Sequence, residues 1–138
     1  MTLMVRASAF GPQETLLRLL AAIEARGMTV FARFDHAAAA RAVGLSLRPT
    51  EVVVFGDPRA GTPLMQASPT LALELPLRVL VVERDDGTTA LVAEEPALAA
   101  ARYDAPATVA PMTVRMHAVL EAVMADAAAG AALGGDQK

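Results

Sequence analysis

The sequence predicts an α/β fold of the α+β, two-layer kind, in which helices cover a small mixed sheet. Short apolar runs rich in β-branched residues, such as 51–55, alternate with longer segments whose apolar residues recur at helical spacing, such as 12–26. Asp85-Asp86-Gly87 lies between two further strand-like runs and is typical of a hairpin turn. For a chain of 138 residues we expect one domain with a single layer of helices on the sheet.

The first half of the chain is expected to form three strands and two helices. Pro12 suits a first helical turn, and Gly27 suits the residue just after a helix. Between them, Leu16, Leu19 and Ile23 recur at helical spacing and predict a buried stripe. The expected elements are strands at 2–6, 28–34 and 51–55, and helices at 12–26 and 36–43.

The second half is expected to begin with a tight turn at 56–61. Thr62-Pro63 combines a helix-capping residue with a proline and predicts a short helix that ends near residue 67. The remaining expected elements are strands at 77–83 and 88–93 and helices at 96–102 and 113–129. We expect the domain to span 1–129 and the Gly-rich residues 130–138 to form a flexible tail.

The composition excludes several classes of function. A net charge of −3 gives no basic surface for a phosphate backbone, and four Phe, one Tyr and no Trp give no stacking platform for single strands. Because the chain has no cysteine, it has no disulfide, thiol nucleophile or Cys-ligated metal. The sequence shows neither a signal-peptide pattern nor a window of roughly 18 apolar residues. We therefore expect a cytoplasmic protein with no nucleic-acid or membrane partner.

The segment from Gly56 to Met65 carries the first candidate site. A glycine-containing turn between a buried strand and a helix start is a place where backbone N–H groups and the helix dipole converge on a ligand. Asp57 and Thr62 would orient a polar ligand there, and Met65 would form part of the pocket wall. The alternative is a tight turn capped by Thr62 with no ligand, because the segment lacks the spacing and the lysine of a phosphate-binding loop.

Asp35 and His36 form the second candidate group. Asp35 occupies the position of a helix cap, and His36 is the residue type whose charge changes near neutral pH. If the strands that precede Asp35 and Gly56 are parallel neighbours, both groups lie at the same edge of the sheet, where ligands of α/β proteins gather. The alternative is a capping Asp35 with an exposed His36.

The two histidines of the chain could contribute to a metal or haem site, but the sequence favours neither. His117 and Glu121 are four residues apart on an expected helix, a spacing that more often gives a solvated surface pair than a metal site. His36 and Met65 are chemically suited to haem iron, but the seven methionines of the chain are more simply explained as core filler. We expect no resident cofactor and no metal.

Several short motifs, in this order and spacing, resemble the small prokaryotic domain-of-unknown-function 302 family. They lie within residues 10–104 and are Asp35-His36-Ala37, Gly44-Leu45, Arg48-Pro49-Thr50, Phe55-Gly56-Asp57-Pro58, Gly61-Thr62-Pro63-Leu64-Met65 and Leu75-Pro76-Leu77. The resemblance implies a compact α/β fold similar to one repeat of the TATA-box-binding protein, and a homodimer. It implies no activity, because the family has none assigned.

The chain departs from the family pattern at three positions. Asp57 replaces an asparagine, which exchanges an amide that both donates and accepts for a carboxylate that only accepts. Glu74 stands before Leu75-Pro76 where an aspartate is usual. Ala93 is followed by two glutamates where a tyrosine is common, which removes a ring available for stacking.

Three functional hypotheses follow. The first is a module that binds or senses a small polar ligand. Its candidate residues are Asp35, His36, Asp57, Gly61, Thr62 and Met65. The second is an enzyme in which His36 is a general base and Asp57 or Glu74 is its carboxylate partner, which requires those groups within hydrogen-bond reach. The third is a structural or protein-interaction module with no ligand.

Overall fold

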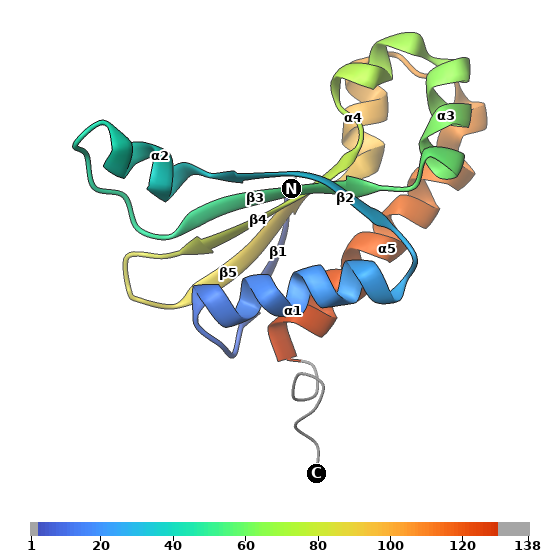
Figure 1. The fold of residues 1–138 in the computed structure, drawn as a ribbon. Coiled ribbons are helices and arrows are strands. Elements are labelled where there is room, and N and C mark those ends of the chain that lie inside the picture. The colour runs from blue at the N-terminus through green and yellow to red at the C-terminus, as the bar shows by residue number, and fades with distance from the viewer. Residues whose placement is uncertain (1–2, 130–138) are drawn as a thin grey trace.

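The computed structural model describes residues 3–129, and the expected flexible tail at 130–138 lies outside them. Five strands in this range form one sheet in the order β1-β5-β4-β3-β2 (Figure 1). The strands are β1 (Leu3–Ser8), β2 (Thr29–Asp35), β3 (Thr50–Gly56), β4 (Leu77–Glu83) and β5 (Thr89–Glu94). The α+β class and the positions of all five strands match the sequence prediction to within two residues.

All four pairs of neighbouring strands are antiparallel, so the expected mixed sheet is wrong. The pairing that matters most is β2 with β3, which we expected to be parallel. A parallel pair needs a connection that crosses the face of the sheet. Here the connection contains only the short helix α2 (His36–Ala42), which stays at the end of the sheet, and the chain turns back (Figure 1).

Two helices cover one face of the sheet. These are α1 (Pro12–Ala25) and α5 (Ala110–Ala129), which pack on each other and on the strands (Figure 1). Pro12 lies in the first turn of α1, and Gly27, at φ +71°, follows its end, as the sequence indicates. The main core is formed by Leu16, Leu19, Ile23, Val53, Phe55, Val79, Val81, Leu91, Leu120, Val123 and Met124.

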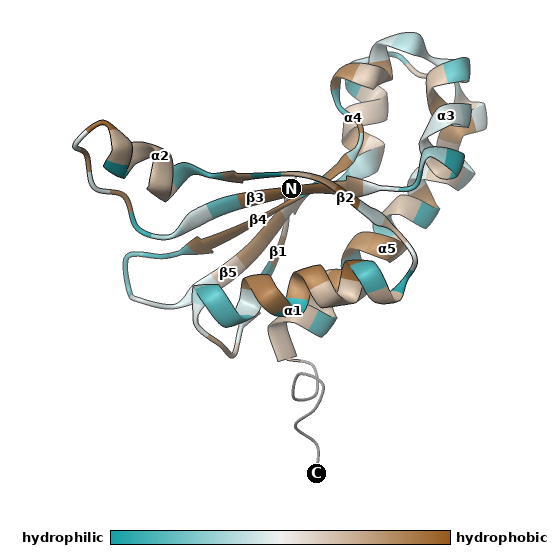
Figure 2. Cartoon of the chain, in the orientation of Figure 1, coloured by the Kyte–Doolittle hydropathy of each residue, from teal (hydrophilic) through white to brown (hydrophobic). Residues whose placement is uncertain are grey.

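An apolar row crosses the opposite face of the sheet. Residues directly opposite each other on antiparallel strands share a face, and one such row crosses all five strands. The row is Val5, Val92, Leu80, Val52 and Phe34, which we call the open face. Val5 and Phe34 at its two ends are each 52% exposed. The brown colour of β3 and β4 in Figure 2 shows how apolar the central strands are on the whole.

A smaller second core lies beyond the Gly56 end of β3. It is built by α3 (Pro58–Ala67), the 3₁₀ turn η1 (Pro69–Leu73), α4 (Pro96–Arg102), the 3₁₀ turn η2 (Ala107–Val109) and the first turns of α5. Its buried residues are Leu64, Leu71, Ala100 and Val109. Residues of both cores contribute to the walls of the two cavities described below.

The start of α3 differs from the prediction. The helix begins at Pro58 with Asp57 as its cap, so the expected turn at 56–61 and the expected cap at Thr62 are wrong. Asp57-Pro58 and Thr62-Pro63 carry the same signature of a capping residue followed by proline, and the first of the two begins the helix. Pro63 lies inside α3, where it cannot donate to the carbonyl four residues earlier.

Candidate functional site

The larger of two cavities described here lies between the Gly56–Met65 segment and α5. It has a volume of about 620 Å³, and we call it the methionine cavity. Four of the seven methionines of the chain line it, and most of its remaining wall is apolar. The methionines are Met28, Met65, Met112 and Met116, and the neighbouring apolar residues include Phe31, Leu75, Pro76, Leu77 and Val119.

One face of α5 forms a whole wall of the methionine cavity. Met112, Arg115, Met116 and Val119 are spaced by three, one and three residues, so their side chains share one stripe of the helix. Leu120, Val123 and Met124, further along the helix, are buried in the main core, and Val119 also packs against that core. The helix therefore packs against the main core with one part of its surface and lines the methionine cavity with another.

The opposite wall begins at the cap of α3. The carboxylate of Asp57 accepts from the backbone N–H of Arg59 at 3.0 Å and from the guanidinium nitrogens Nε and Nη2 of Arg59 at 3.1 and 3.0 Å. These hydrogen bonds, the side-chain ones above all, hold the pKa of Asp57 below its usual range. Asp57 thus occupies the position at the helix N-terminus where we expected a ligand.

Backbone and side chains approach closely in the cavity wall near the end of β3. A Cβ atom added at Gly56 would stand 3.3 Å from the Cβ of Pro76 and 3.8 Å from the Phe31 ring. Gly61 differs, because a Cβ added there meets no atom within 4 Å. Gly56 therefore permits the packing of the wall, whereas Gly61 leaves open space.

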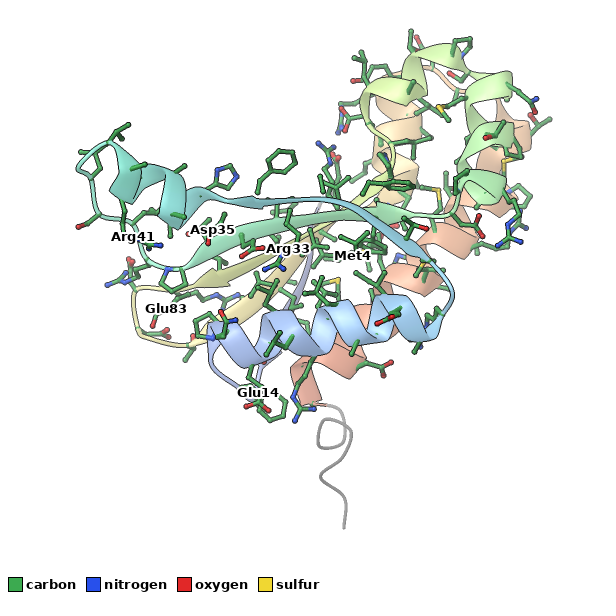
Figure 3. All side chains as sticks on the ribbon, viewed as in Figure 1. Met4, Glu14, Arg33, Asp35, Arg41 and Glu83 are labelled. Carbon is green, nitrogen blue, oxygen red and sulfur yellow. The ribbon has the colours of Figure 1, made fainter. Side chains whose placement is uncertain are left out.

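The structure separates the two groups of candidate residues. Asp57, Gly61, Thr62 and Met65 line the methionine cavity. Asp35 and His36 do not, because Asp35 pairs with Glu51 at the far end of β3 from Gly56. At about 3.4 Å per residue, the two ends lie roughly 17 Å apart. Figure 3 shows Asp35 and Arg41 at the end of the molecule opposite α3.

The surroundings of Asp35 and His36 fit a helix start. Asp35 accepts from the backbone N–H of Ala38 at 2.9 Å and so caps α2. His36 is exposed and lines neither of the two cavities described here. The expected parallel pairing of β2 with β3 is wrong, and within one chain His36 lies far from Asp57.

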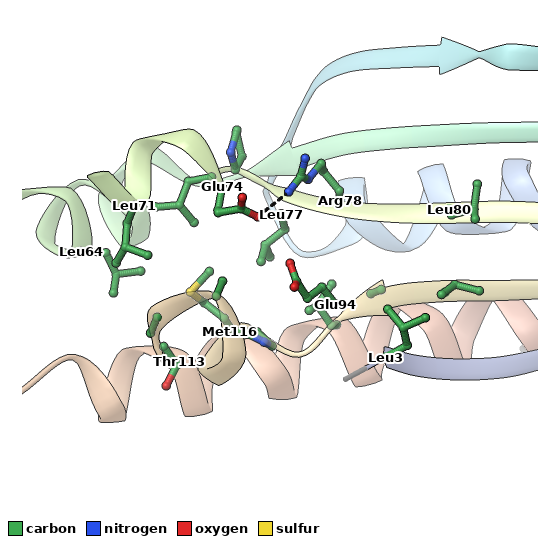
Figure 4. Close-up of a pocket in the computed structure, with 18 of the residues that line it drawn as sticks. Leu3, Leu64, Leu71, Glu74, Leu77, Arg78, Leu80, Glu94, Thr113 and Met116 are labelled. Carbon is green, nitrogen blue, oxygen red and sulfur yellow. Dashed lines mark hydrogen bonds and ion pairs between the residues drawn. The ribbon is translucent and has the colours of Figure 1, made fainter. Parts of the chain in front are cut away.

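Glu74 lies in a second cavity of about 270 Å³, which we call the glutamate cavity (Figure 4). Its carboxylate accepts from Arg78 at 2.9 Å, from Arg102 at 3.3 Å and from the Tyr103 hydroxyl at 3.0 Å. Arg102 also donates to Glu94, whose side chain points toward Glu74 from β5. Both oxygens of each carboxylate are thereby engaged, and the network ties α4 to β4 and β5.

The network shifts the pKa values of Glu94 and Tyr103 in opposite directions. The hydrogen bonds from Arg102 hold the pKa of Glu94 below its usual range. Donation to Glu74 raises the pKa of Tyr103, because loss of its proton would break that hydrogen bond and place two negative charges together. Neither shift points to a group poised for proton transfer near neutral pH.

The candidate metal and haem ligands do not come together. His117 Nδ1 is 2.8 Å from a Glu95 oxygen, whereas its Nε2 is 3.9 Å from Glu121. Within residues 3–129 no three His, Cys, Asp or Glu side chains are grouped so that they could hold a metal ion. His36 and Met65 lie on opposite ends of the sheet, so they cannot share a haem.

Sequence reasoning missed the α5 wall. It did not single out Arg115, Met112 or Phe31. One signal was available: Met112, Met116 and Val119 form an apolar stripe that widens the apolar surface of this helix beyond Leu120, Val123 and Met124, and the stripe carries Arg115. A second apolar stripe on one helix indicates a second surface to cover.

Comparison with known proteins identifies the family. The model described as "Domain of unknown function DUF302" matches residues 4–123. The chain belongs to the DUF302 family. A solved structure described as an uncharacterized conserved DUF302 protein from Bacillus stearothermophilus has the same fold, with a TM-score of 0.84, 17% sequence identity, and coverage of 92% of this chain and 98% of that one.

Part of this DUF302 chain is also similar to longer proteins. Over 90 residues, 65% of the chain, it is 44% identical to proteins named fluoride-specific ion channel FluC 1 from Brucella suis biovar 1 (strain 1330) and Brucella abortus biovar 1 (strain 9-941). The matched region covers 35% and 33% of those proteins, so the chain spans about a third of their length. Among the described residues, none of the helices is long and apolar enough to cross a membrane.

Proposed function

We propose that this DUF302 domain binds a small molecule in the methionine cavity. The observation that carries the proposal is the cavity itself, about 620 Å³ in volume, with the Gly56–Met65 segment on one side and α5 on the other. Ligand sites commonly have volumes of about 300–1,000 Å³ and mostly apolar walls with a few polar groups. The four predicted residues Asp57, Gly61, Thr62 and Met65 supply part of this wall.

The proposed ligand has an apolar body rather than a wholly polar one. Methionine side chains are flexible and polarizable, and they adapt to ligands of irregular shape. The polar groups of the wall are few: the Thr62 hydroxyl, the Asp57–Arg59 pair and Arg115. These groups would orient one end of the ligand while the methionines enclose the rest.

A variant that fills the cavity tests the proposal. Gly61 lines the cavity and a Cβ there meets no atom within 4 Å, so Gly61→Leu begins a large side chain in open space, whereas Gly61→Ala adds only a methyl group. We expect the neutral dye Nile red to gain fluorescence with the wild-type protein and with Gly61→Ala, and much less with Gly61→Leu. Circular dichroism would verify that both variants are folded. Equal dye binding by Gly61→Leu, or no binding by the wild type, would contradict a ligand in this cavity.

The enzyme hypothesis has less support. Its general base, His36, is not within hydrogen-bond reach of Asp57 or Glu74, because both carboxylates lie near the other end of β3 and β4. Glu74 is held by Arg78, Arg102 and Tyr103 instead. We therefore place ligand binding ahead of catalysis.

We also propose that two copies of the domain associate through their open faces. Antiparallel sheets with one solvated face usually carry polar residues there, whereas this row is apolar across all five strands. Five strands about 4.8 Å apart and about 20 Å long give a flat footprint of roughly 500 Å². A typical stable interface takes roughly 800 Å² from each partner, and this footprint supplies the larger part of that area. The cytoplasmic location expected from the sequence stays a prediction.

A further inference from the structure

We propose that the ligand of the methionine cavity is an amphipathic anion, which is an apolar chain or ring that ends in one carboxylate or similar group. This inference rests on the proposed function, since it specifies the chemistry of the molecule in the same cavity. It depends on the charges of the wall and on which of them are already paired.

Three ionisable side chains line the cavity, and two of them neutralise each other. Asp57 and Arg59 are joined by the three hydrogen bonds described above, and both carboxylate oxygens of Asp57 accept from Arg59. A ligand cation would have to displace Arg59 from this pair to reach Asp57. The pair therefore fits the role of a cap for α3 better than that of a cation site.

Arg115 is the remaining charge. It lies on α5 in the stripe that faces the cavity, and it forms no hydrogen bond or ion pair with another residue in the range 3–129. Asp57, Arg59 and Arg115 together leave the cavity wall with one net positive charge, although the whole chain has a net charge of −3. A guanidinium presents parallel donors that match a carboxylate, so an anion is its natural partner.

The neighbours of Arg115 specify the rest of the ligand. Met112 and Met116 are three residues before and one residue after it, and Val119 is four residues after it, so its charge stands beside apolar groups. Phe31 and Met65 belong to the same cavity from other elements. A molecule that satisfies both the charge and the apolar wall has an anionic head and an apolar body.

Three eight-carbon molecules with different heads test this inference: octanoate, octan-1-ol and octyltrimethylammonium, each measured by calorimetry at concentrations at which it is dissolved as single molecules. We expect octanoate to bind about tenfold more tightly than octan-1-ol, at the low end of what a hydrogen bond to a charged group contributes. The cation should bind more weakly than the alcohol. The preference for octanoate should decrease as salt is added, because Arg115 is exposed.

The matched variants are Arg115→Gln and Arg41→Gln. Arg41 is exposed on α2 and lines neither cavity, so its substitution removes the same charge at a distance from the site. We expect Arg115→Gln to abolish the preference for octanoate over octan-1-ol and Arg41→Gln to preserve it. Equal binding of the acid and the alcohol, an unchanged preference in Arg115→Gln, or no binding of octanoate would overturn the inference. The Nile red experiment tests ligand binding in the methionine cavity independently of the ligand's charge, because that dye is neutral.

Discussion

Thr89 carries a buried hydroxyl without a hydrogen-bond partner in the described part of the chain. It is 2% exposed at the start of β5. A buried polar atom without a partner loses its hydration and gains nothing in return. We expect Thr89→Val, which replaces the hydroxyl by a methyl group of similar size, to raise the free energy of unfolding by about 1 kcal/mol.

Urea denaturation measures this change, and Thr113 supplies the control. Thr113 is also buried, but its hydroxyl donates to the carbonyl of Ala110 at 3.0 Å. Thr113→Val should therefore lower the free energy of unfolding. A loss of stability in both variants would mean that the Thr89 hydroxyl has a partner in solution.

Tyr103 supports a second prediction at the scale of single residues. Its pKa is raised chiefly because its hydroxyl donates to Glu74. A group with a raised pKa contributes stability that is complete below its unfolded value, about 10 for tyrosine, and is lost as pH rises through the folded value. We expect the free energy of unfolding to fall in this alkaline window, and to fall less in Tyr103→Phe.

Absorbance gives a direct measurement, because the chain has one tyrosine. The tyrosinate signal of the folded protein should titrate above the usual range of a phenol. In Glu74→Gln the negative charge is absent and the pKa of Tyr103 should move back toward its ordinary value. Identical titration curves for the wild type and Glu74→Gln would show that this hydrogen bond is not formed.

At the scale of elements, α3 contains a glycine that its backbone does not require. Gly61 has no positive φ, and a Cβ there meets open space. Since glycine inside a helix costs about 0.5–1 kcal/mol relative to alanine, we expect Gly61→Ala to raise the free energy of unfolding by about that amount. The matched control is Gly27→Ala, which should destabilise because Gly27 has φ +71° after α1. Thermal unfolding compares the two, and a lower melting temperature for Gly61→Ala would contradict the prediction.

The elements themselves were largely predictable, because each depends on a local pattern. The stripe of Leu16, Leu19 and Ile23 and the alternation in 51–55 indicate α1 and β3 without reference to the rest of the chain. The start of α3 was not predictable in this way. Asp57-Pro58 and Thr62-Pro63 are equally good starts locally, and the packing of Leu64 in the second core depends on residues far along the chain.

The direction of strand pairing was the other property that could not be predicted from the sequence. It determines which candidate residues lie close together. Asp57, Gly61, Thr62 and Met65 are close in sequence, so they reach one cavity whatever the pairing. Their relation to Asp35 and His36 depends on whether β2 and β3 are parallel, which is a property of the sheet and not of either strand. For the same reason, the contribution of Arg115 depends on where α5 packs.

At the scale of the whole molecule, the open face predicts a dimer. We expect the wild-type protein to sediment as a dimer, because an apolar row that crosses the full sheet is better covered than solvated. Leu80→Arg places a charge at the centre of this row and should give a monomer. The control is Leu73→Arg, because Leu73 is 73% exposed on η1 and lies outside the row. A monomeric wild type, or a dimeric Leu80→Arg, would count against association through this face.

The two cavities share part of their walls. Leu75, Pro76, Leu77 and Met116 line both of them, and the glutamate cavity extends to Val52, Leu80 and Val92 of the open face. A ligand beside Arg115 and a second copy of the domain on the open face would therefore lie on opposite sides of the shared wall. Any coupling between the two events is reciprocal: the factor by which association changes ligand affinity equals the factor by which ligand changes association. Dimer formation and ligand binding in the methionine cavity would then be linked equilibria, with Met116 in the wall that the two cavities share.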